Sequence, residues 1–142
     1  MKKWTWWGVL ILALAVAIGC EEGDDSNGSI VGDYTDEWGS AYSFSETEVV
    51  VVFPPYEEGG DETTVIAAVL SLNTNDEYLI TDNGDGTFGR YDWTFVGDDL
   101  FYCQIESAAD SAEAAEANEA ADRKSPTDAG CGDFGWTLLS PV

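Results

Sequence analysis

Short segments of β-branched and aromatic residues, separated by turn-forming residues, constrain the fold of this chain more than any other feature. Tyr42 and Phe44 alternate with serines, and residues 48–53 read Glu-Val-Val-Val-Val-Phe. A two-residue alternation is the period of a half-buried strand, and β-branched side chains pack well on a pleated sheet. Similar segments occupy residues 30–38, 63–72, 77–81, 87–95, 100–105 and 134–139. The sequence therefore predicts seven or eight short strands.

The residues between these segments favour antiparallel neighbours. Pro54 and Pro55 cannot continue a hydrogen-bonded ladder, and the polar residues 57–62 after them form a loop. Residues 82–86 read Asp-Asn-Gly-Asp-Gly and contain two dipeptides typical of hairpin turns. We expect an all-β fold, either a small antiparallel barrel or a sandwich.

One later segment has a different composition. Residues 107–122 combine Ala with Asp or Glu and contain few β formers, so they predict a single helix. Ser107 is placed to cap its N-terminus, and Arg123 and Lys124 suit the negative end of the helix dipole. The acidic residues recur every three positions and repel one another. The packing of this helix should therefore be weak.

The N-terminus has the features of an export signal. Lys2 and Lys3 precede an apolar segment over residues 9–18, and about 10 residues are too few to span a bilayer. The segment ends in Ala17-Ile18-Gly19-Cys20, which resembles the lipobox of bacterial lipoproteins, with Ala17 where Leu is commonest. The resemblance implies that residues 1–19 are cleaved off and that the Cys20 sulfur carries a diacylglycerol. The alternative is an ordinary secretory signal with Cys20 near the cleavage site.

This resemblance also implies an organisation for the rest of the chain. Residues 20–29 are a flexible acidic tether, and residues 30–142 are a single domain. Two or three acyl chains hold a protein on a membrane almost irreversibly, so we expect membrane attachment outside the cytoplasm through Cys20. Glu21 after the Cys favours the outer membrane under the enteric sorting rule, and leaves open whether the domain faces the periplasm or the surface.

The two remaining cysteines are expected to pair. Export places Cys103 and Cys131 where disulfides form, and two free buried thiols are the alternative. The segments around them, Tyr-Cys-Gln and Gly-Cys-Gly, are similar to parts of uncharacterised bacterial lipoproteins, a likeness that implies no activity. Residues 30–34 are similar to the Gly-x-Trp opening strand of lipocalins, with Tyr34 in the Trp position. That similarity favours a closed barrel over a sandwich and implies no ligand.

Charge and composition exclude several functions. All 28 acidic residues follow Cys20, with three basic ones, so the processed chain carries 3 − 28 = −25 side-chain charges. Such a surface repels nucleic acid and favours cations, basic partners or plain solubility. The chain contains no His, which excludes Ser-His-Asp and Cys-His catalysis and His-bearing zinc sites. A hydrolase built on two carboxylates is a weaker third hypothesis, no cofactor is indicated, and we do not expect an enzyme.

Calcium is considered because residues 82–87 place oxygen ligands on a Gly-rich turn. When Asp85 and Gly86 are aligned to the fifth and sixth positions of an EF-hand loop, Thr81 replaces the first Asp. The twelfth position is Asp92 and not Glu. A hairpin turn explains the pattern without a metal, so no metal site is assigned and weak calcium binding is the alternative.

The candidate ligand-facing residues are aromatic, and they could line a pocket or fill the core. They are Trp38, Trp93, Tyr102 and Trp136. Two hypotheses follow: a lipid-anchored, non-catalytic binding or interaction domain, and a structural lipoprotein that coats the envelope with acidic charge. A cavity lined by these aromatics favours the first, and a filled interior with only scattered surface charge favours the second. The ligand or partner is not specified by the sequence.

Overall fold

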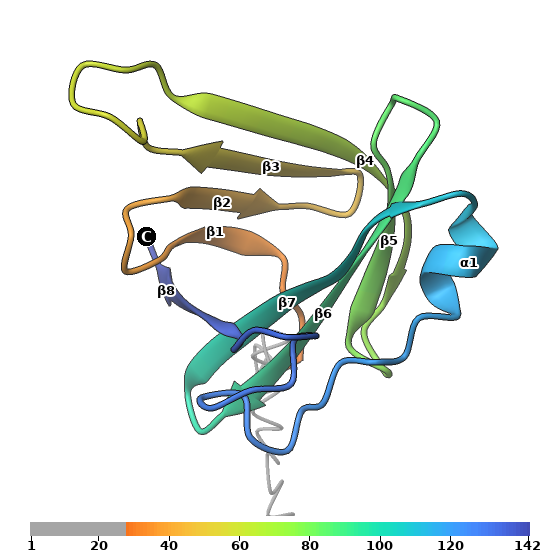
Figure 1. Cartoon of the computed structure of the whole chain (residues 1–142). Coiled ribbons are helices and arrows are strands. Elements are labelled where there is room, and N and C mark those ends of the chain that lie inside the picture. The colour runs from red at the N-terminus through yellow and green to blue at the C-terminus, as the bar shows by residue number, and fades with distance from the viewer. Residues whose placement is uncertain (1–27) are drawn as a thin grey trace, which may run out of the picture.

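The computed structural model describes residues 28–142, which fold into a closed antiparallel barrel of eight strands (Figure 1). Each strand pairs with its neighbour in the sequence, and the last pairs with the first. The strands are β1 (Gly32–Thr35), β2 (Ala41–Phe44), β3 (Glu48–Phe53), β4 (Thr63–Asn73), β5 (Tyr78–Asp82), β6 (Phe88–Val96), β7 (Asp99–Ala109) and β8 (Thr137–Pro141). The predicted all-β barrel is confirmed, and the sandwich alternative is excluded. The expected signal peptide, Cys20 and the tether up to residue 27 lie outside the described residues.

Alternation along the strands fills the barrel interior. Trp93 and Leu79 have no exposed surface, and Phe44 and Tyr42 are almost completely buried. The ring centroids of Tyr42 and Tyr102 lie 5.1 Å apart, a distance at which aromatic rings attract one another. Truncation of one such core aromatic to Ala costs about 3–5 kcal/mol of stability. The middle of the interior is therefore a packed core, and a hollow of about 620 Å³ opens at one end of it, lined by Leu72, Phe95, Leu100 and Leu139 among others.

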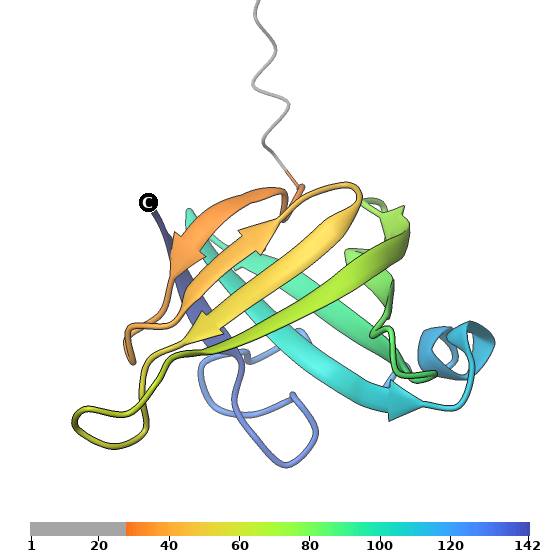
Figure 2. The same ribbon diagram turned by 90° about the horizontal axis from the view of Figure 1, so that it is seen from above.

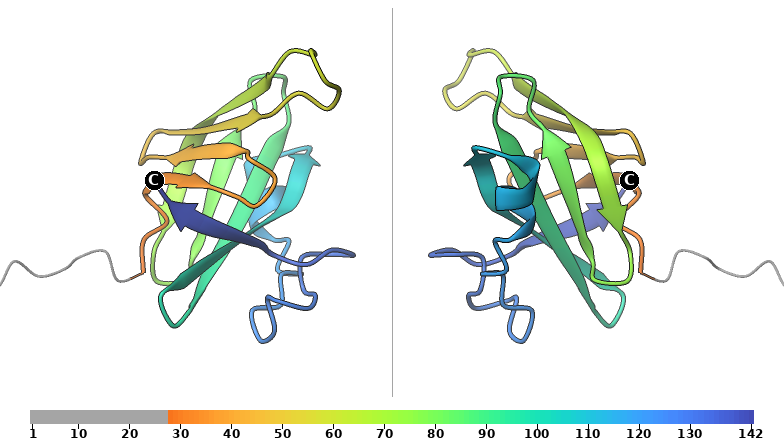
Figure 3. Two further views of the ribbon diagram at one scale, coloured as in Figure 1. Left: turned by 90° about the vertical axis from the view of Figure 1, so that its left-hand side faces the viewer. Right: turned by 90° about the vertical axis from the view of Figure 1, so that its right-hand side faces the viewer.

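The chain between β7 and β8, residues 110–136, lies outside the barrel, and we call it the outer segment. It passes over the outer faces of β5, β6 and β7, as the blue ribbon of Figures 2 and 3 shows. Near its start, Ala115 packs against Ile80 of β5. Near its end, Trp136 packs against Phe101 of β7. The outer segment thus covers apolar side chains on a wall that would otherwise face water.

A disulfide attaches the outer segment to the barrel. Cys103 lies on the outer face of β7 and is 1% exposed, and its sulfur is bonded to that of Cys131 at 2.04 Å. The predicted pairing is confirmed. The bond closes a loop whose ends are 28 residues apart in sequence. In the chain-entropy model a loop of this length contributes about 3–4 kcal/mol by restricting the unfolded chain.

The expected helix over residues 107–122 is wrong in its extent, because the observed α1 spans only Ala112–Glu116. Residues 107–109 continue β7, and the backbone carbonyl of Ser107 accepts a hydrogen bond from Asn83. The N-cap is Ser111, whose hydroxyl accepts a hydrogen bond from the Ala114 amide. No basic residue lies in the last turn, and the acidic side chains repel along the helix. At the N-terminal end of the predicted helix, pairing of residues 107–109 with the sheet outcompetes their helix propensity. At the C-terminal end, repulsion between the acidic side chains limits the length of the helix.

Candidate functional site

The four aromatic residues predicted to face a ligand separate into two pairs. Trp93 and Tyr102 belong to the core inside the barrel. Trp38 and Trp136 lie outside it, and both line one surface groove. Trp38 is 65% exposed, whereas Trp136 is 7% exposed and contributes only an edge. The structure therefore brings two of the four candidates together, at a site on the barrel wall.

The groove runs over the outer face of β8. Leu138 and Ser140 of β8 line its floor, with Asp99 and Phe101 of the neighbouring β7. The turn between β1 and β2 forms one side, and the end of the outer segment forms the other. Its volume is about 450 Å³, which is large enough for a side chain or a short segment of a partner. We call this site the β8 groove.

A network of hydrogen bonds holds Trp38 in the turn between β1 and β2. The Asp36 carboxylate accepts hydrogen bonds from the Trp38 amide at 3.0 Å, the Ser40 amide at 2.8 Å and the Tyr42 hydroxyl at 2.7 Å. Gly39 completes the turn with a φ of 82°, a value that favours glycine. Burial raises the pKa of Tyr42, so its hydroxyl remains a donor to Asp36 over the physiological range. The exposed indole of Trp38 therefore extends from a hydrogen-bonded turn, which the Tyr42 hydroxyl connects to the core.

A second hollow lies on the other side of the same turn. Trp38 lines it together with Phe53, Pro54, Pro55 and Tyr56 from the end of β3 and the loop after it. Phe53 is 40% exposed, and the Tyr56 side chain is fully exposed. Sequence reasoning missed both aromatic residues. The available signal was their position on either side of the Pro pair, with Phe53 at the end of a strand and Tyr56 in a polar loop.

The β8 groove is acidic as well as aromatic. Asp36, Glu37 and Asp99 line it, and no Lys or Arg is among its lining residues. The ion pairs of the described residues involve other carboxylates, so Glu37 and Asp99 keep their charges uncompensated there. Like charges around one groove raise its negative potential. The site therefore attracts cations and repels anions.

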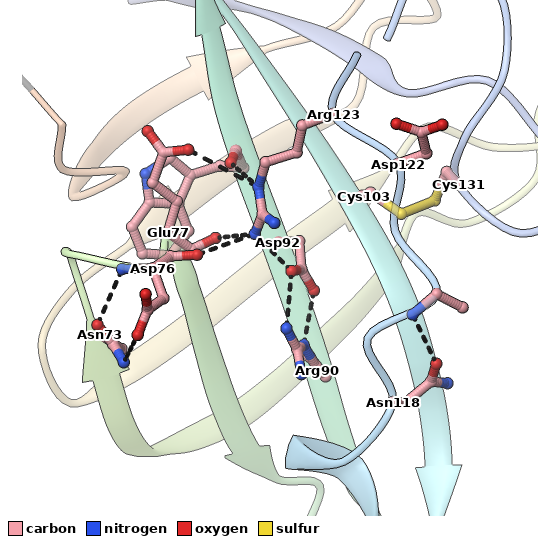
Figure 4. A network of polar contacts seen from close by, with 12 residues as sticks. Asn73, Asp76, Glu77, Arg90, Asp92, Cys103, Asn118, Asp122, Arg123 and Cys131 are labelled. Atoms are coloured by element: carbon pink, nitrogen blue, oxygen red, sulfur yellow. Dashed lines mark hydrogen bonds and ion pairs between the residues drawn. A yellow bond between two sulfur atoms is a disulfide. The ribbon is translucent and has the colours of Figure 1, made fainter. Parts of the chain in front are cut away.

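The two arginines of the barrel domain bind a carboxylate on β6, two strands away from β8 (Figure 4). Asp92 of β6 has no exposed surface and accepts hydrogen bonds from Arg90 Nε at 2.8 Å, Arg90 Nη2 at 3.0 Å and Arg123 Nη2 at 2.6 Å. Arg123 also donates to the backbone carbonyls of Trp93 and Glu77, and Arg90 donates to the carbonyl of Glu116. We call Arg90, Asp92 and Arg123 the arginine clasp. It attaches the outer segment to β6.

The polar side chains in the cleft beside the clasp are already paired with one another. Glu77 Oε2 lies 3.7 Å from Arg123 Nε, and burial raises the pKa of Glu77 while the Arg123 charge opposes that shift. Arg90 stacks over the Tyr78 ring at 4.4 Å, and the Tyr78 hydroxyl donates to Glu116. Every buried side-chain nitrogen or oxygen in residues 28–142 has a hydrogen-bond partner. These groups are therefore engaged in holding the fold, and we assign them a structural role.

The turn considered for calcium has its own hydrogen bonds. The Asp82 carboxylate accepts from the Gly84 amide, and the Asp85 carboxylate accepts from the amide and hydroxyl of Thr87. Within residues 28–142, no group of three or more His, Cys, Asp or Glu side chains is arranged to hold a metal ion. Weak calcium binding remains a hypothesis that the turn geometry does not require.

The sequence matches no protein-family model, no curated protein and no solved structure. Among the described residues, no helix is long and apolar enough to cross a bilayer. Any assignment of function must therefore be argued from the chain's own residues.

Proposed function

We propose that this chain is a lipid-anchored, extracytoplasmic lipoprotein whose barrel binds a partner through the β8 groove without catalysing a reaction. The support for the anchor is in the sequence. The N-terminus has the order of a lipoprotein signal: two basic residues, Lys2 and Lys3, then a short apolar segment, and then the Ala17-Ile18-Gly19-Cys20 motif. The lipid on Cys20 would tether the barrel to the outer membrane.

The exposed indole of Trp38, which extends from a hydrogen-bonded turn, is the observation that supports binding most directly. A large apolar side chain left in water forgoes about 1.5–3 kcal/mol of burial energy. Three hydrogen bonds to Asp36 hold the backbone of the turn that presents it, so the turn is ordered before any partner arrives. Preorganised aromatic residues at the surface are typical of binding sites, because little entropy is lost when a partner covers them.

A structural role in coating the envelope is the second candidate, and the packed aromatic core in the middle of the barrel favours it. Tyr42, Trp93 and Tyr102 occupy the space that would hold a ligand in a hollow barrel. Acidic residues scattered over the surface would suffice for a hydrated coat. That role does not account for Trp38 or for the groove that it shares with Trp136, and we therefore rank binding first.

Site-specific crosslinking in the native membrane tests the binding role. We would place a photoreactive phenylalanine analogue at Trp38 and, as the matched control, at Ile66, an exposed apolar residue on the outer face of β4 that is 57% exposed. We expect a discrete adduct from position 38 and none from position 66. Equal adducts at both positions, or none at 38, would contradict the proposal.

The anchor is tested separately by membrane fractionation. The wild-type chain should sediment with membranes, and Cys20→Ser should release the barrel or leave an unprocessed precursor. A Cys20→Ser protein that is processed and retained like the wild type would exclude the thioether lipid as the tether.

A further inference from the structure

We propose that the occupant of the β8 groove is a basic side chain, an arginine in particular, presented by a segment of a partner protein. This inference rests on the proposed binding role and specifies the partner's chemistry. It is carried by the combination of Trp38, Glu37 and Asp99 at one groove.

The aromatic part of the site suits a guanidinium group. A cation over the face of Trp is attracted by the ring quadrupole, and a planar guanidinium can also stack on the indole. The same chain already uses this contact, because Arg90 lies over the Tyr78 ring. At the β8 groove an exposed indole is present, and within residues 28–142 no cation lies over it.

The charged part of the site suits the same group. Glu37 and Asp99 come from different elements, the β1–β2 turn and the start of β7, and both line the groove. A bound arginine would bring a positive charge into the groove and offset the repulsion among the carboxylates that line it. Asp36 adds negative potential, but its oxygens are engaged with the turn. A neutral ligand would leave the repulsion in place, and an anion would increase it.

The rest of the molecule favours a cationic partner over long distances. The processed chain carries 3 − 28 = −25 side-chain charges, and both arginines of the barrel domain are paired with Asp92 in the clasp on β6. The negative potential of so acidic a protein accelerates the approach of basic partners. Specific contacts are then made in the groove. Binding should therefore weaken with salt, because charge contributes both to encounter and to contact.

The test is calorimetric titration of the full chain in detergent with a blocked tetra-arginine peptide, using a tetra-citrulline peptide as the neutral probe. The double variant Glu37→Gln/Asp99→Asn removes two charges from the groove. The matched control Glu113→Gln/Glu119→Gln removes two charges near α1, on the opposite side of the barrel (Figure 1). Because both double variants change the net charge by the same amount, a difference between them reports the groove itself and not the negative charge of the whole protein.

We expect binding of the arginine peptide and not of the citrulline peptide. The groove variant should weaken binding by about 2- to 30-fold relative to the control variant, the range for two exposed ion pairs. Trp38→Ala should weaken it by about 2- to 30-fold through loss of the cation–π contact, with an unchanged melting temperature because the side chain is exposed. Equal weakening by both double variants, with no effect of Trp38→Ala, would show binding to diffuse charge and overturn the inference.

A second titration distinguishes an error in the proposed arginine occupant from an error in the proposed binding role. If a short neutral oligosaccharide binds the wild type and loses affinity in Trp38→Ala, while the arginine peptide shows no dependence on the groove, then the basic occupant is wrong and the binding role stands. If neither probe depends on Trp38 and the crosslinker at position 38 gives no adduct, both proposals fail.

Discussion

Replacement of Asp92 by Asn tests whether the arginine clasp holds the outer segment on the barrel. The substitution keeps the size of the side chain and removes its charge. One oxygen that accepts from a guanidinium is replaced by an amide nitrogen that would face another donor. Arg90 is 5% exposed and would keep a buried positive charge without its partner.

The expected cost follows from the burial of the three side chains. Removing one partner of a buried ion pair costs about 3–5 kcal/mol. The Arg123 side chain is 30% exposed, so water compensates part of its loss, and most of the cost arises at Arg90. We expect Asp92→Asn to lower the free energy of unfolding by about 3–4 kcal/mol, out of the roughly 5–15 kcal/mol that is usual for a domain. The melting temperature should fall by about 10–20 °C.

The assay is urea unfolding followed by Trp fluorescence with the disulfide intact. Asp128→Asn is the matched control, because Asp128 is exposed in the outer segment and its loss should cost less than about 0.5 kcal/mol. A cycle with Arg123→Gln should give a coupling energy of about 0.5–3 kcal/mol with Asp92→Asn. A loss below about 1 kcal/mol for Asp92→Asn, or zero coupling, would refute the assignment of the clasp as a structural contact.

Three further predictions concern pH, the disulfide and calcium. Burial raises the pKa of Tyr91 to about 12 and also raises the pKa of Tyr42 and of Tyr102, so above pH 10 the unfolded chain loses protons that the folded chain keeps. The contribution of Tyr91 to stability should be complete below pH 10 and should fall by about 1.4 kcal/mol per pH unit as the pH rises toward 12. Tyr42 and Tyr102 should add to the fall, and equal urea midpoints at pH 9 and 11 would contradict this. Replacing both Cys103 and Cys131 by Ala should cost about 3–4 kcal/mol in the same unfolding assay, and an unchanged midpoint would be the contrary result. Millimolar calcium should produce neither heat nor a change in melting temperature, and a saturable heat would restore the calcium hypothesis.

Much of the barrel can be predicted from the sequence because its strands carry a local signal. The alternation around Tyr42 and Phe44 and the turn dipeptides at residues 82–86 each act within a few residues of the chain. The predicted strand over residues 48–53 has the bounds of β3. Cysteine counting, together with the expectation of export, likewise predicted the disulfide. These features need no knowledge of the tertiary structure.

The features that sequence reasoning missed depend on distant residues. Asp92 and Arg123 are 31 positions apart, and no local pattern relates them. Trp38 was expected within the first strand, but Asp36 and Gly39 end that strand at Thr35 and place the indole in a turn. The β8 groove exists only because the barrel closes between β1 and β8. Its acidic residues could not be selected in advance among 28 candidates.

Intact-mass spectrometry of the protein from its native membrane tests the central claim, a lipid-tethered and disulfide-bonded barrel, most directly. We predict the mass of residues 20–142 plus a diacylglycerol and a further acyl chain, less the two hydrogens lost in the Cys103–Cys131 bond. A mass that includes residues 1–19, or a chain with an unmodified thiol at Cys20, would contradict it.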